Sequence, residues 1–390
     1  MALSKPTILF LASWYPSPIK KSHGIFIRNH ALALSNFCNV IIAYAYSDNT
    51  AKGFELTKNK VNEHFEEWLV VYKKTSSTTP VFSRLLKYLN FKKAYKLLGE
   101  ELSAEHINVK AIQINTVYPA AMALQCFLKK WQVPFTVLEH WTGYLPEDGN
   151  YKGALLKYYT RKTIAKAAKI FHVSEKQKLA MLSHQLFGNY ELIYNVVDTS
   201  IFNTKQKTRP AKPLFLHVSS LDDAQKNITG ILNAIAALQK KDLVFDFIFI
   251  GGDKDLIIKH TNYLNQLKLK DVAFIGPKTQ GEIGDYMQRS TALVLFSNYE
   301  NMPVVVLEAL ACGLPVISSN TGHLTSIVRP EFGKLFSIGD EKELAKNINE
   351  ILLGTSHFDA RKMNTFIVSR AAATIVGKQL YDFYKSLIEA

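Results

Sequence analysis

Short apolar runs rich in β-branched residues alternate along the chain with stretches of helical period. The runs of the first half are Thr7–Ala12, Val40–Ala43, Ala111–Ile114, Phe135–Leu138 and Lys169–Val173. Those of the second half are Leu214–Val218, Phe247–Ile250, Val272–Ile275, Ala292–Phe296 and Pro315–Ser318. Strands that alternate with helices form βαβ units and parallel sheets. The pattern therefore predicts an α/β protein with two doubly wound parallel sheets.

The segment between the two series of strands, residues 199–213, is polar and basic and contains two prolines. This composition is typical of an exposed connection, and 390 residues exceed what one hydrophobic core usually supports. We expect two Rossmann-like domains, residues 1–200 and 201–370, with a C-terminal helix at about residues 370–390 that packs back on the first. Because open parallel sheets bind ligands beyond the carboxyl ends of their strands, two such domains facing each other would share one cleft.

Positive charge is concentrated in the first half of the chain. The net charge is +14, and residues 1–200 hold 25 Lys and Arg against 14 Asp and Glu. Such an asymmetry favours an acidic partner, either nucleic acid or an anionic membrane surface. The stretches Phe82–Lys96 and Lys152–Lys169 place basic residues among aromatic and leucine positions. Two interpretations remain, peripheral association with a membrane or ordinary helices with solvated basic faces.

Cysteine usage and hydropathy indicate the compartment. Cys38, Cys126 and Cys312 have the spacing of neither a disulfide framework nor a metal cluster, which favours a reducing environment. The apolar stretch Thr7–Trp14 leads into Tyr15-Pro16 instead of a small-residue cleavage site, which favours a strand over a signal peptide. No apolar run reaches the roughly 18 residues of a membrane-spanning helix. We expect a cytoplasmic protein that binds the inner face of the cell membrane peripherally, if at all.

Glu308 is a carboxylate inside an otherwise apolar run, VVVLEALAC. Pro303 is suited to be the first residue of a helix there, and Gly313 stands just past its end. A helix that is apolar all round is buried, and a buried carboxylate needs hydrogen-bond donors. The hydroxyls of a ribose would serve, and so would an internal salt bridge to Lys or Arg. Glu300 precedes this helix on the loop after the strand Ala292–Phe296.

Glu300 and Glu308 form the E-x7-E pattern of family 4 glycosyltransferases, and EALACGLPVISSNTG resembles the continuation of that pattern. Further segments resemble the family in the same order, namely residues 13–34, 137–144, 173–181, 194–202 and 217–235. The chain is thus similar to this family over most of its length. The resemblance implies the GT-B fold, with two facing Rossmann-like domains, and transfer of a sugar from a nucleotide diphosphate donor with retention of anomeric configuration.

The resemblance also implies roles by position. Glu308 would hold the ribose hydroxyls, and Glu300 would contact the donor sugar. Asn301, Met302 and Pro303 span the helix entry, where the family places phosphate or sugar hydroxyls because the first backbone N–H groups of a helix favour an anion. Lys226 resembles the lysine that neutralises the diphosphate. His140, at the end of the strand Phe135–Glu139, resembles the histidine near the C6 hydroxyl of the donor sugar.

One departure from the family concerns the diphosphate. Ser219 and Ser220 stand where the family usually has Gly-Arg, so the second cation of the clamp is missing unless Ser219, Ser220, Gln225 or Lys226 compensates. Gly24 follows the basic loop Lys20–His23, and the absence of a side chain would let backbone N–H groups approach a phosphate. An ordinary turn glycine is the alternative.

Acidic residues elsewhere give weaker signals. Asp253-Lys254-Asp255 resembles the DxD metal motif of a different glycosyltransferase fold, but acidic triplets are common in loops. The GT-B fold disperses phosphate charge with lysine, arginine and helix dipoles, so we expect no metal ion and no other cofactor. Asn195 and Asp198 match a family motif, and we expect a turn role for them.

The sequence therefore predicts a hexosyltransferase-like enzyme of polysaccharide or glycolipid biosynthesis. Its donor would be a UDP- or GDP-sugar, and its acceptor a hydroxyl of a glycan or lipid-linked molecule. Two alternatives remain, a nucleotide-sugar epimerase of the GT-B fold and a non-catalytic protein that binds nucleic acid through its basic half. Since the basic residues match no recognised nucleic-acid motif, we do not expect nucleic acid as a partner.

Overall fold

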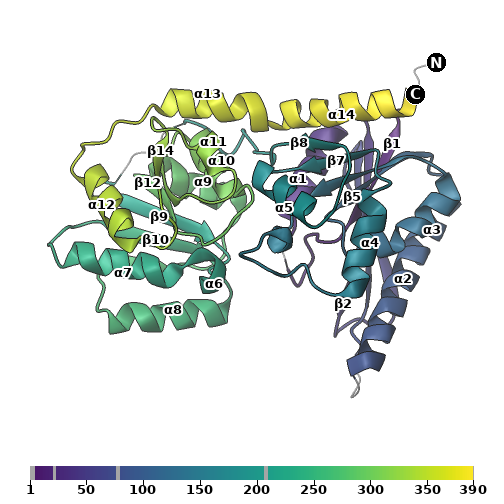
Figure 1. Cartoon of the computed structure of the whole chain (residues 1–390), viewed down its shortest axis with the longest axis horizontal. Helices are drawn as coiled ribbons and strands as arrows, with labels where there is room; N and C mark the ends of the chain where they lie inside the picture. Colours follow the sequence, from purple (N-terminus) through teal and green to yellow (C-terminus); the bar gives the residue numbers. More distant parts are fainter. Residues whose placement is uncertain (1–4, 21–22, 76–79, 206–209, 390) are drawn as a thin grey trace. The chain divides into compact units, whose positions relative to one another are not determined.

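The computed structural model describes residues 5–20, 23–75, 80–205 and 210–389, and it divides into two compact units (Figure 1). Unit 1 comprises Met1–Val196 together with Ala373–Ala390, and unit 2 comprises Val197–Ala372. The chain thus leaves unit 1 close to the polar connection at residues 199–213 and returns to it for the last helix. Part of that connection, residues 206–209, lies outside the described residues.

Unit 1 is built on an eight-stranded sheet in the order β3-β4-β2-β1-β5-β6-β7-β8. The strands are β1 (Thr7–Ala12), β2 (Asn39–Asp48), β3 (Phe54–Asn62), β4 (Phe65–Lys73), β5 (Val109–Asn115), β6 (Phe135–Glu139), β7 (Lys169–His172) and β8 (Tyr190–Leu192). All neighbouring strands are parallel except β3 and β4, which pair antiparallel. The five apolar runs of the first half are confirmed as strands of this sheet, whereas β3, β4 and β8 were not predicted.

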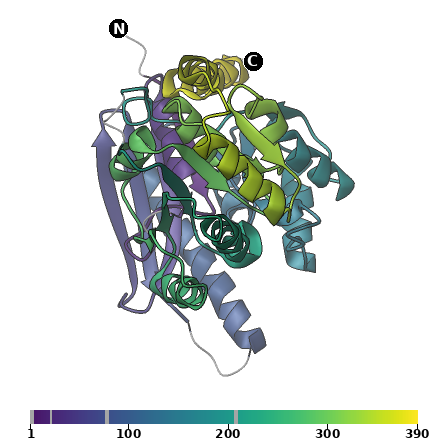
Figure 2. The same cartoon turned by 90° about the vertical axis from the view of Figure 1, so that its left-hand side faces the viewer.

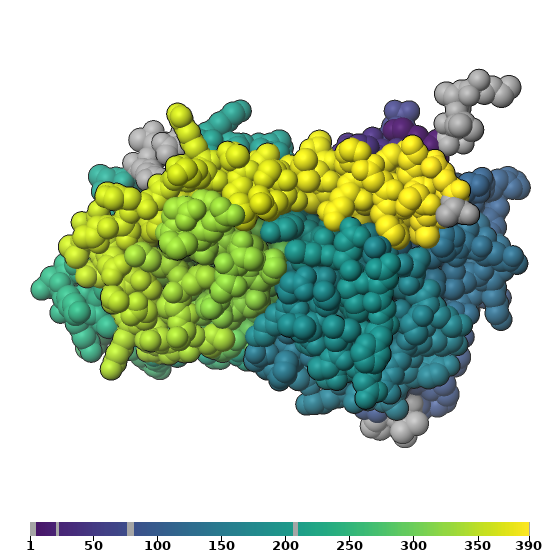
Figure 3. All heavy atoms as spheres, turned by 45° about the horizontal axis from the view of Figure 1, so that its top comes forward, coloured from purple at the N-terminus to yellow at the C-terminus, as the bar shows by residue number. Residues whose placement is uncertain are grey.

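The last helix of the chain belongs to unit 1. The helices of this unit are α1 (Ile25–Ser35), α2 (Pro80–Ala104), α3 (Ala121–Trp131), η1 (Thr142–Tyr144), α4 (Ala154–Ile164), α5 (Glu175–Ser183) and α14 (Ala373–Glu389). Helix α14 packs so closely on α1 that a Cβ atom at Gly377 would lie 2.1 Å from the carbonyl oxygen of Ala33. The buried Tyr384 hydroxyl donates to Gln113 Oε1 over 2.7 Å and lies 2.6 Å from Thr136 Oγ1. The outer side of α14 forms part of the surface of unit 1 (Figure 3).

Unit 2 contains a six-stranded, wholly parallel sheet in the order β11-β10-β9-β12-β13-β14. The strands are β9 (Leu214–Ser219), β10 (Asp246–Gly251), β11 (Val272–Phe274), β12 (Ala292–Leu295), β13 (Val316–Ser319) and β14 (Gly333–Phe336). All five runs predicted for the second half are strands of this sheet. Strand β14 was not predicted.

Helices cover both faces of the second sheet. They are α6 (Asp223–Lys226), α7 (Ile228–Gln239), α8 (Lys254–Gln266), α9 (Gln280–Arg289), α10 (Val304–Ala311), α11 (Leu324–Ile327), α12 (Glu341–Leu352) and α13 (Ala360–Ala371). Helices α7, α8 and α12 share one hydrophobic core with β9, β10 and β12, and α7 and α8 lie side by side (Figures 1 and 2). None of the described helices is long and apolar enough to cross a bilayer.

Candidate functional site

The predicted donor residues of unit 2 gather where strands β9 and β12 end. Strand β12 ends at Leu295, and a short loop leads to α10, whose N-cap is Pro303. The helix therefore begins one residue later than expected, since Pro303 itself has an extended ψ of 115°. Gly313 follows the last turn with a φ of 67°, a left-handed conformation that glycine adopts without strain.

Glu308 lies within α10 and is 8% exposed. Burial raises the pKa of its carboxyl group to about 8. Among the described residues, no side chain forms an ion pair or hydrogen bond with this carboxylate. The interpretation of Glu308 as half of an internal salt bridge is therefore wrong, because a paired glutamate would have a charged neighbour that lowers its pKa. The ribose role stays a prediction.

The salt bridge of this site involves Glu300 instead. Lys226 Nζ donates to Glu300 Oε1, and Ser297 Oγ donates to the same oxygen over 2.9 Å. The side chains of Lys226 and Glu300 are only 13% and 8% exposed. The family resemblance assigned these two residues separate roles, toward diphosphate and sugar, and the fold places the two charges in contact. A ligand that binds between them meets a positive and a negative group side by side.

Hydrogen bonds to its backbone hold the Glu300 loop in place from two sides. Asn298 N donates to Gln225 O over 2.8 Å, and Gln225 Nε2 donates to Tyr299 O over 3.3 Å. On the other side, His323 N donates to Asn301 O over 3.0 Å. These contacts join helix α6 and the loops that follow β12 and β13. Asn301, Met302 and Pro303 are buried within this arrangement at the entry of α10.

The two serines that replace Gly-Arg occupy different environments. Ser219 Oγ lies 2.7 Å from His217 Nε2 and accepts from Leu221 N over 3.0 Å. Since His217 Nδ1 lies 2.8 Å from Val294 O, Nδ1 carries the proton and Ser219 donates to Nε2. Burial lowers the pKa of His217 to about 3, so the ring is neutral. Ser219 is thus engaged within the protein, whereas Ser220 is exposed.

Unit 1 places His140 beside helix α1. Its ring centroid lies 4.3 Å from that of Phe26 and 5.5 Å from that of His30. Burial, and secondarily the nearby His30, holds the pKa of His140 well below its usual range. The imidazole is therefore neutral at physiological pH. A neutral ring can accept or donate a hydrogen bond to a sugar hydroxyl, which the predicted role requires.

The neighbouring Glu139 is a structural residue that the sequence did not single out. Its fully buried carboxylate accepts from the backbone N–H groups of Val117, His140 and Trp141 and from the Tyr144 hydroxyl, all at 2.9–3.0 Å. It therefore ties together the loops that follow β5 and β6. Its position in the strand-end motif VLEHWTGY is the signal that could have identified it.

Gly24 has a local reason to be glycine. It is the N-cap of α1 with a φ of 71°, and a Cβ atom there would lie 2.7 Å from the backbone of Trp14. This close packing fits the turn interpretation, and phosphate binding stays a prediction. Two residues of the preceding basic loop, Lys21 and Ser22, lie outside the described residues.

The weaker motifs have local structural uses. Asp198 Oδ1 accepts from Ser200 N over 3.0 Å and from Ser200 Oγ over 2.6 Å, as expected for a turn. Asp253 caps α8 by accepting from Leu256 N over 2.9 Å. The absence of a metal ion from the reaction stays a prediction.

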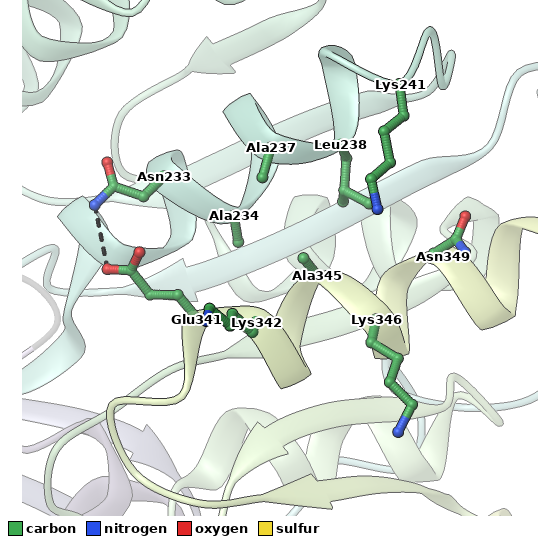
Figure 4. Close-up of a pocket in the computed structure, with 10 residues that line it drawn as sticks. All are labelled: Asn233, Ala234, Ala237, Leu238, Lys241, Glu341, Lys342, Ala345, Lys346 and Asn349. Carbon is green, nitrogen blue, oxygen red and sulfur yellow. Dashed lines mark hydrogen bonds between the residues drawn. The ribbon is translucent and has the colours of Figure 1, made fainter.

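A shallow groove of about 340 Å³ lies between α7 and α12, away from these residues (Figure 4). Side chains of the two helices and of Lys241, in the turn after α7, line it, and Asn233 Nδ2 donates to Glu341 Oε1 across one end over 3.2 Å. It contains none of the predicted site residues.

Comparison with known proteins finds similarity to glycosyltransferases. A family model described as glycosyl transferases group 1 matches residues 199–365. The chain is 26% identical over 260 residues to an uncharacterized glycosyltransferase of Methanocaldococcus jannaschii, which covers 66% of this chain and 69% of that protein. It is 20% identical over 358 residues to the alpha-monoglucosyldiacylglycerol synthase of Streptococcus pneumoniae, which covers 86% of this chain and 78% of that enzyme.

A solved structure resembles the whole chain. HepE of Anabaena in complex with UDP-glucose has a TM-score of 0.69 at 16% identity, with 97% of this chain and 99% of that chain covered. At this identity the likeness establishes the fold. It does not by itself assign a ligand.

Proposed function

We propose that the chain acts as a glycosyltransferase of group 1, with the GT-B fold, and uses a nucleoside diphosphate sugar as donor. The donor would carry UDP or GDP, and the sugar would pass with retention to a hydroxyl of a glycan or lipid-linked acceptor. UDP-glucose in the similar HepE structure supports the donor class. The similarity to a glucosyldiacylglycerol synthase supports a role in glycan or glycolipid biosynthesis.

The observation that carries this proposal is the carboxylate of Glu308, which is buried and has no ion-pair or hydrogen-bond partner among the described residues. Burying a carboxylate without donors costs several kcal/mol, so such a group is retained where a ligand supplies the donors. Two vicinal hydroxyls of a ribose donate two hydrogen bonds to one carboxylate. Glu308 lies in the helix whose entry follows Glu300, so a nucleotide held there would bring its diphosphate toward Lys226.

The same residues would support departure of the nucleotide. Lys226 and the first N–H groups of α10 would stabilise the charge that develops on the leaving diphosphate, without a metal ion. The acceptor oxygen would attack the anomeric carbon from the face on which the diphosphate leaves. As the new glycosidic bond forms and the bond to the phosphate oxygen breaks, that oxygen takes the acceptor's proton. We assign to the neutral His140 a hydrogen bond to the transferred sugar.

A thermal-shift screen with UDP, GDP, ADP and CMP tests the donor class. One nucleoside diphosphate should raise the melting temperature in proportion to the logarithm of its concentration, as expected for a ligand of the folded state. Glu308→Gln should abolish most of that shift while retaining a cooperative melt. Glu331→Gln, an exposed carboxylate of the same unit, serves as the matched control and should respond like the parent. Unaltered nucleotide binding by Glu308→Gln would exclude the ribose role.

A further inference from the structure

Unit 1 contains a pocket of about 560 Å³ that none of the predicted site residues lines. It lies where β2 and β4 end, and α2, α3, α4 and the loop after β5 contribute its remaining walls. Helix α2 reaches it through residues at positions 84, 87, 88 and 91, which share one face of a helix. Because parallel strands present their carboxyl ends at one edge, the pocket opens at the ligand-binding edge of this sheet.

The charge of the pocket has one sign. Lys74, Arg84 and Lys87 line it, and its lining includes no aspartate or glutamate. Within the described part of the chain, none of these three cations forms an ion pair with a carboxylate. Other lysines of unit 1 do pair with carboxylates, such as Lys58 with Glu101 at 2.6 Å and Lys176 with Glu147 at 2.7 Å. Three unpaired cations around one hollow favour a ligand with more than one negative charge.

The floor of the pocket is aromatic and apolar. Tyr72 and Phe91 are each 8% exposed, and the half-buried Tyr118 closes the side toward β5. Thr75 adds a hydroxyl oxygen that is screened from solvent and has no hydrogen-bond partner among the described residues. Flat aromatic surfaces suit the apolar face of a sugar ring, and an unsatisfied hydroxyl suits a polar ligand atom. The pocket thus combines an anion-binding rim with a surface for a sugar.

We propose that this pocket binds the acceptor, and that the acceptor carries a phosphate group held by Lys74, Arg84 and Lys87. The inference rests on the proposed glycosyl transfer, and it adds the chemical class of the acceptor. The phosphate belongs either to a soluble sugar phosphate or to the head of a lipid phosphate. Both sources present the same doubly charged group to the three cations.

Binding of two probes to the full chain tests the proposal and separates the two sources. Glucose 1-phosphate represents the soluble class, and dihexanoyl phosphatidic acid below its micellar concentration represents the lipid class. Methyl α-glucoside is the neutral comparison. We expect saturable binding of at least one phosphate probe by isothermal titration calorimetry, and at least tenfold weaker binding of the neutral glucoside. Equal binding of the glucoside, or no binding of either phosphate probe, overturns the proposal.

A matched pair of triple variants locates the site. The pocket variant replaces three cations by glutamine, Lys74→Gln, Arg84→Gln and Lys87→Gln. The control removes the same charge from α2 outside the pocket, with Lys92→Gln, Lys93→Gln and Lys96→Gln. The pocket variant should bind the phosphate probe at least tenfold more weakly than the parent, and the control should stay within threefold. If both variants lost affinity for the phosphate probe equally, net charge alone would explain the binding, and the proposal would be overturned.

Binding of UDP and GDP to the same proteins distinguishes failure of the acceptor assignment from failure of the proposed function. The pocket variant should retain the nucleotide response of the parent, because the three cations belong to unit 1 and the predicted nucleotide site to unit 2. Retained nucleotide binding without phosphate-probe binding would reject the acceptor assignment and leave the proposed donor class standing. Absence of any nucleotide response in the parent would reject the proposed function itself.

Discussion

At the scale of single residues, the titration of Glu308 reports on what surrounds its carboxylate. Burial raises its pKa to about 8, whereas a glutamate in the unfolded chain titrates near 4.5. Between these values the folded state binds more protons than the unfolded state, so stability from this group is complete below pH 4.5 and is lost as pH rises through 8. Glu308→Gln should therefore melt at a higher temperature than the parent at pH 8.5 and lose that advantage at pH 5.

A nucleotide bound at Glu308, as we propose, would reverse this dependence of stability on pH. Ribose hydroxyls that donate to the carboxylate favour its charged form, so nucleotide binding at pH 7 should release a proton. Calorimetry in two buffers of different ionisation enthalpy measures that release. The parent should show an enthalpy that varies with buffer, and Glu308→Gln should show a smaller variation. A buffer-independent enthalpy for the parent would mean that the nucleotide does not contact the carboxylate.

Lys226 allows a second test on the same scale, because its proposed partner is the diphosphate and not the nucleoside. Lys226→Gln should weaken binding of the preferred nucleoside diphosphate by about tenfold to a hundredfold, the effect of one charge-assisted hydrogen bond. Binding of the corresponding nucleoside should change by less than threefold. Competition against a fluorescent nucleotide measures both constants. If the affinities for nucleoside and diphosphate fell equally, Lys226 would have a structural role, holding the site in shape through its ion pair with Glu300.

The pairing of Lys226 with Glu300 marks a limit of what the sequence can predict. The two residues lie 74 positions apart, and each had a plausible ligand of its own. Only the register of the parallel sheet brings the end of α6 beside the loop after β12. Glu308 shows the opposite case, since its apolar neighbours along one helix already predicted burial. The sequence could not show whether the carboxylate of Glu308 has an ion-pair partner, because such a partner would come from another element of the fold.

At the scale of elements, most of the strands that the sequence predicted are buried, although the predicted β11 (VAF) has no buried position and the unpredicted β4 (FEEWLVVYK) is buried at five of its nine positions. Strand β1 (TILFLA) is buried at five of its six positions, and such runs are visible without alignment. Strand β3 (FELTKNKVN) has no buried position, because it forms the edge of the sheet and pairs with β4 as an antiparallel hairpin. Its exposed lysines suppress the apolar signal and are typical of a protected edge. Short strands such as β8 (YEL) give too few residues for a pattern.

The loop after β13 supports the loop after β12, and Gly322 packs directly against it, beside the hydrogen bond from His323 N to Asn301 O. A Cβ atom at Gly322 would lie 2.2 Å from Asn301 O and 2.5 Å from Glu300 O. Gly322→Ala should therefore shift the Glu300 loop and weaken nucleotide binding at least tenfold, in addition to lowering the melting temperature. Gly339→Ala is the matched control, since its φ of 78° carries a similar backbone strain but no atom lies within 4 Å of the new Cβ. Comparable losses of nucleotide affinity in both variants would show that backbone strain alone is responsible.

At the scale of the whole molecule, part of the positive charge of the first half of the chain lies on helices that also expose large apolar side chains. Helix α2 exposes Phe82, Leu85 and Leu89, which are 53%, 49% and 49% accessible to solvent. Helix α4 of the same unit exposes Leu155 and Tyr158. Both helices carry lysines and arginines beside these positions, and this combination is typical of a surface that lies on an anionic bilayer.

Sedimentation with vesicles decides whether this surface meets a membrane. The protein should sediment with phosphatidylglycerol vesicles at low salt, remain in solution with phosphatidylcholine, and dissociate as salt screens the charges. The triple variant Phe82→Ser, Leu85→Ser and Leu89→Ser should lower the bound fraction severalfold, because it removes the apolar side chains that would insert and leaves the charge unchanged. Serine at Leu179 and Phe187, which are 63% and 66% exposed in the same unit, controls for a general loss of surface hydrophobicity. If both sets of variants sediment like the parent, charge alone attracts the chain to lipid, and α2 does not insert.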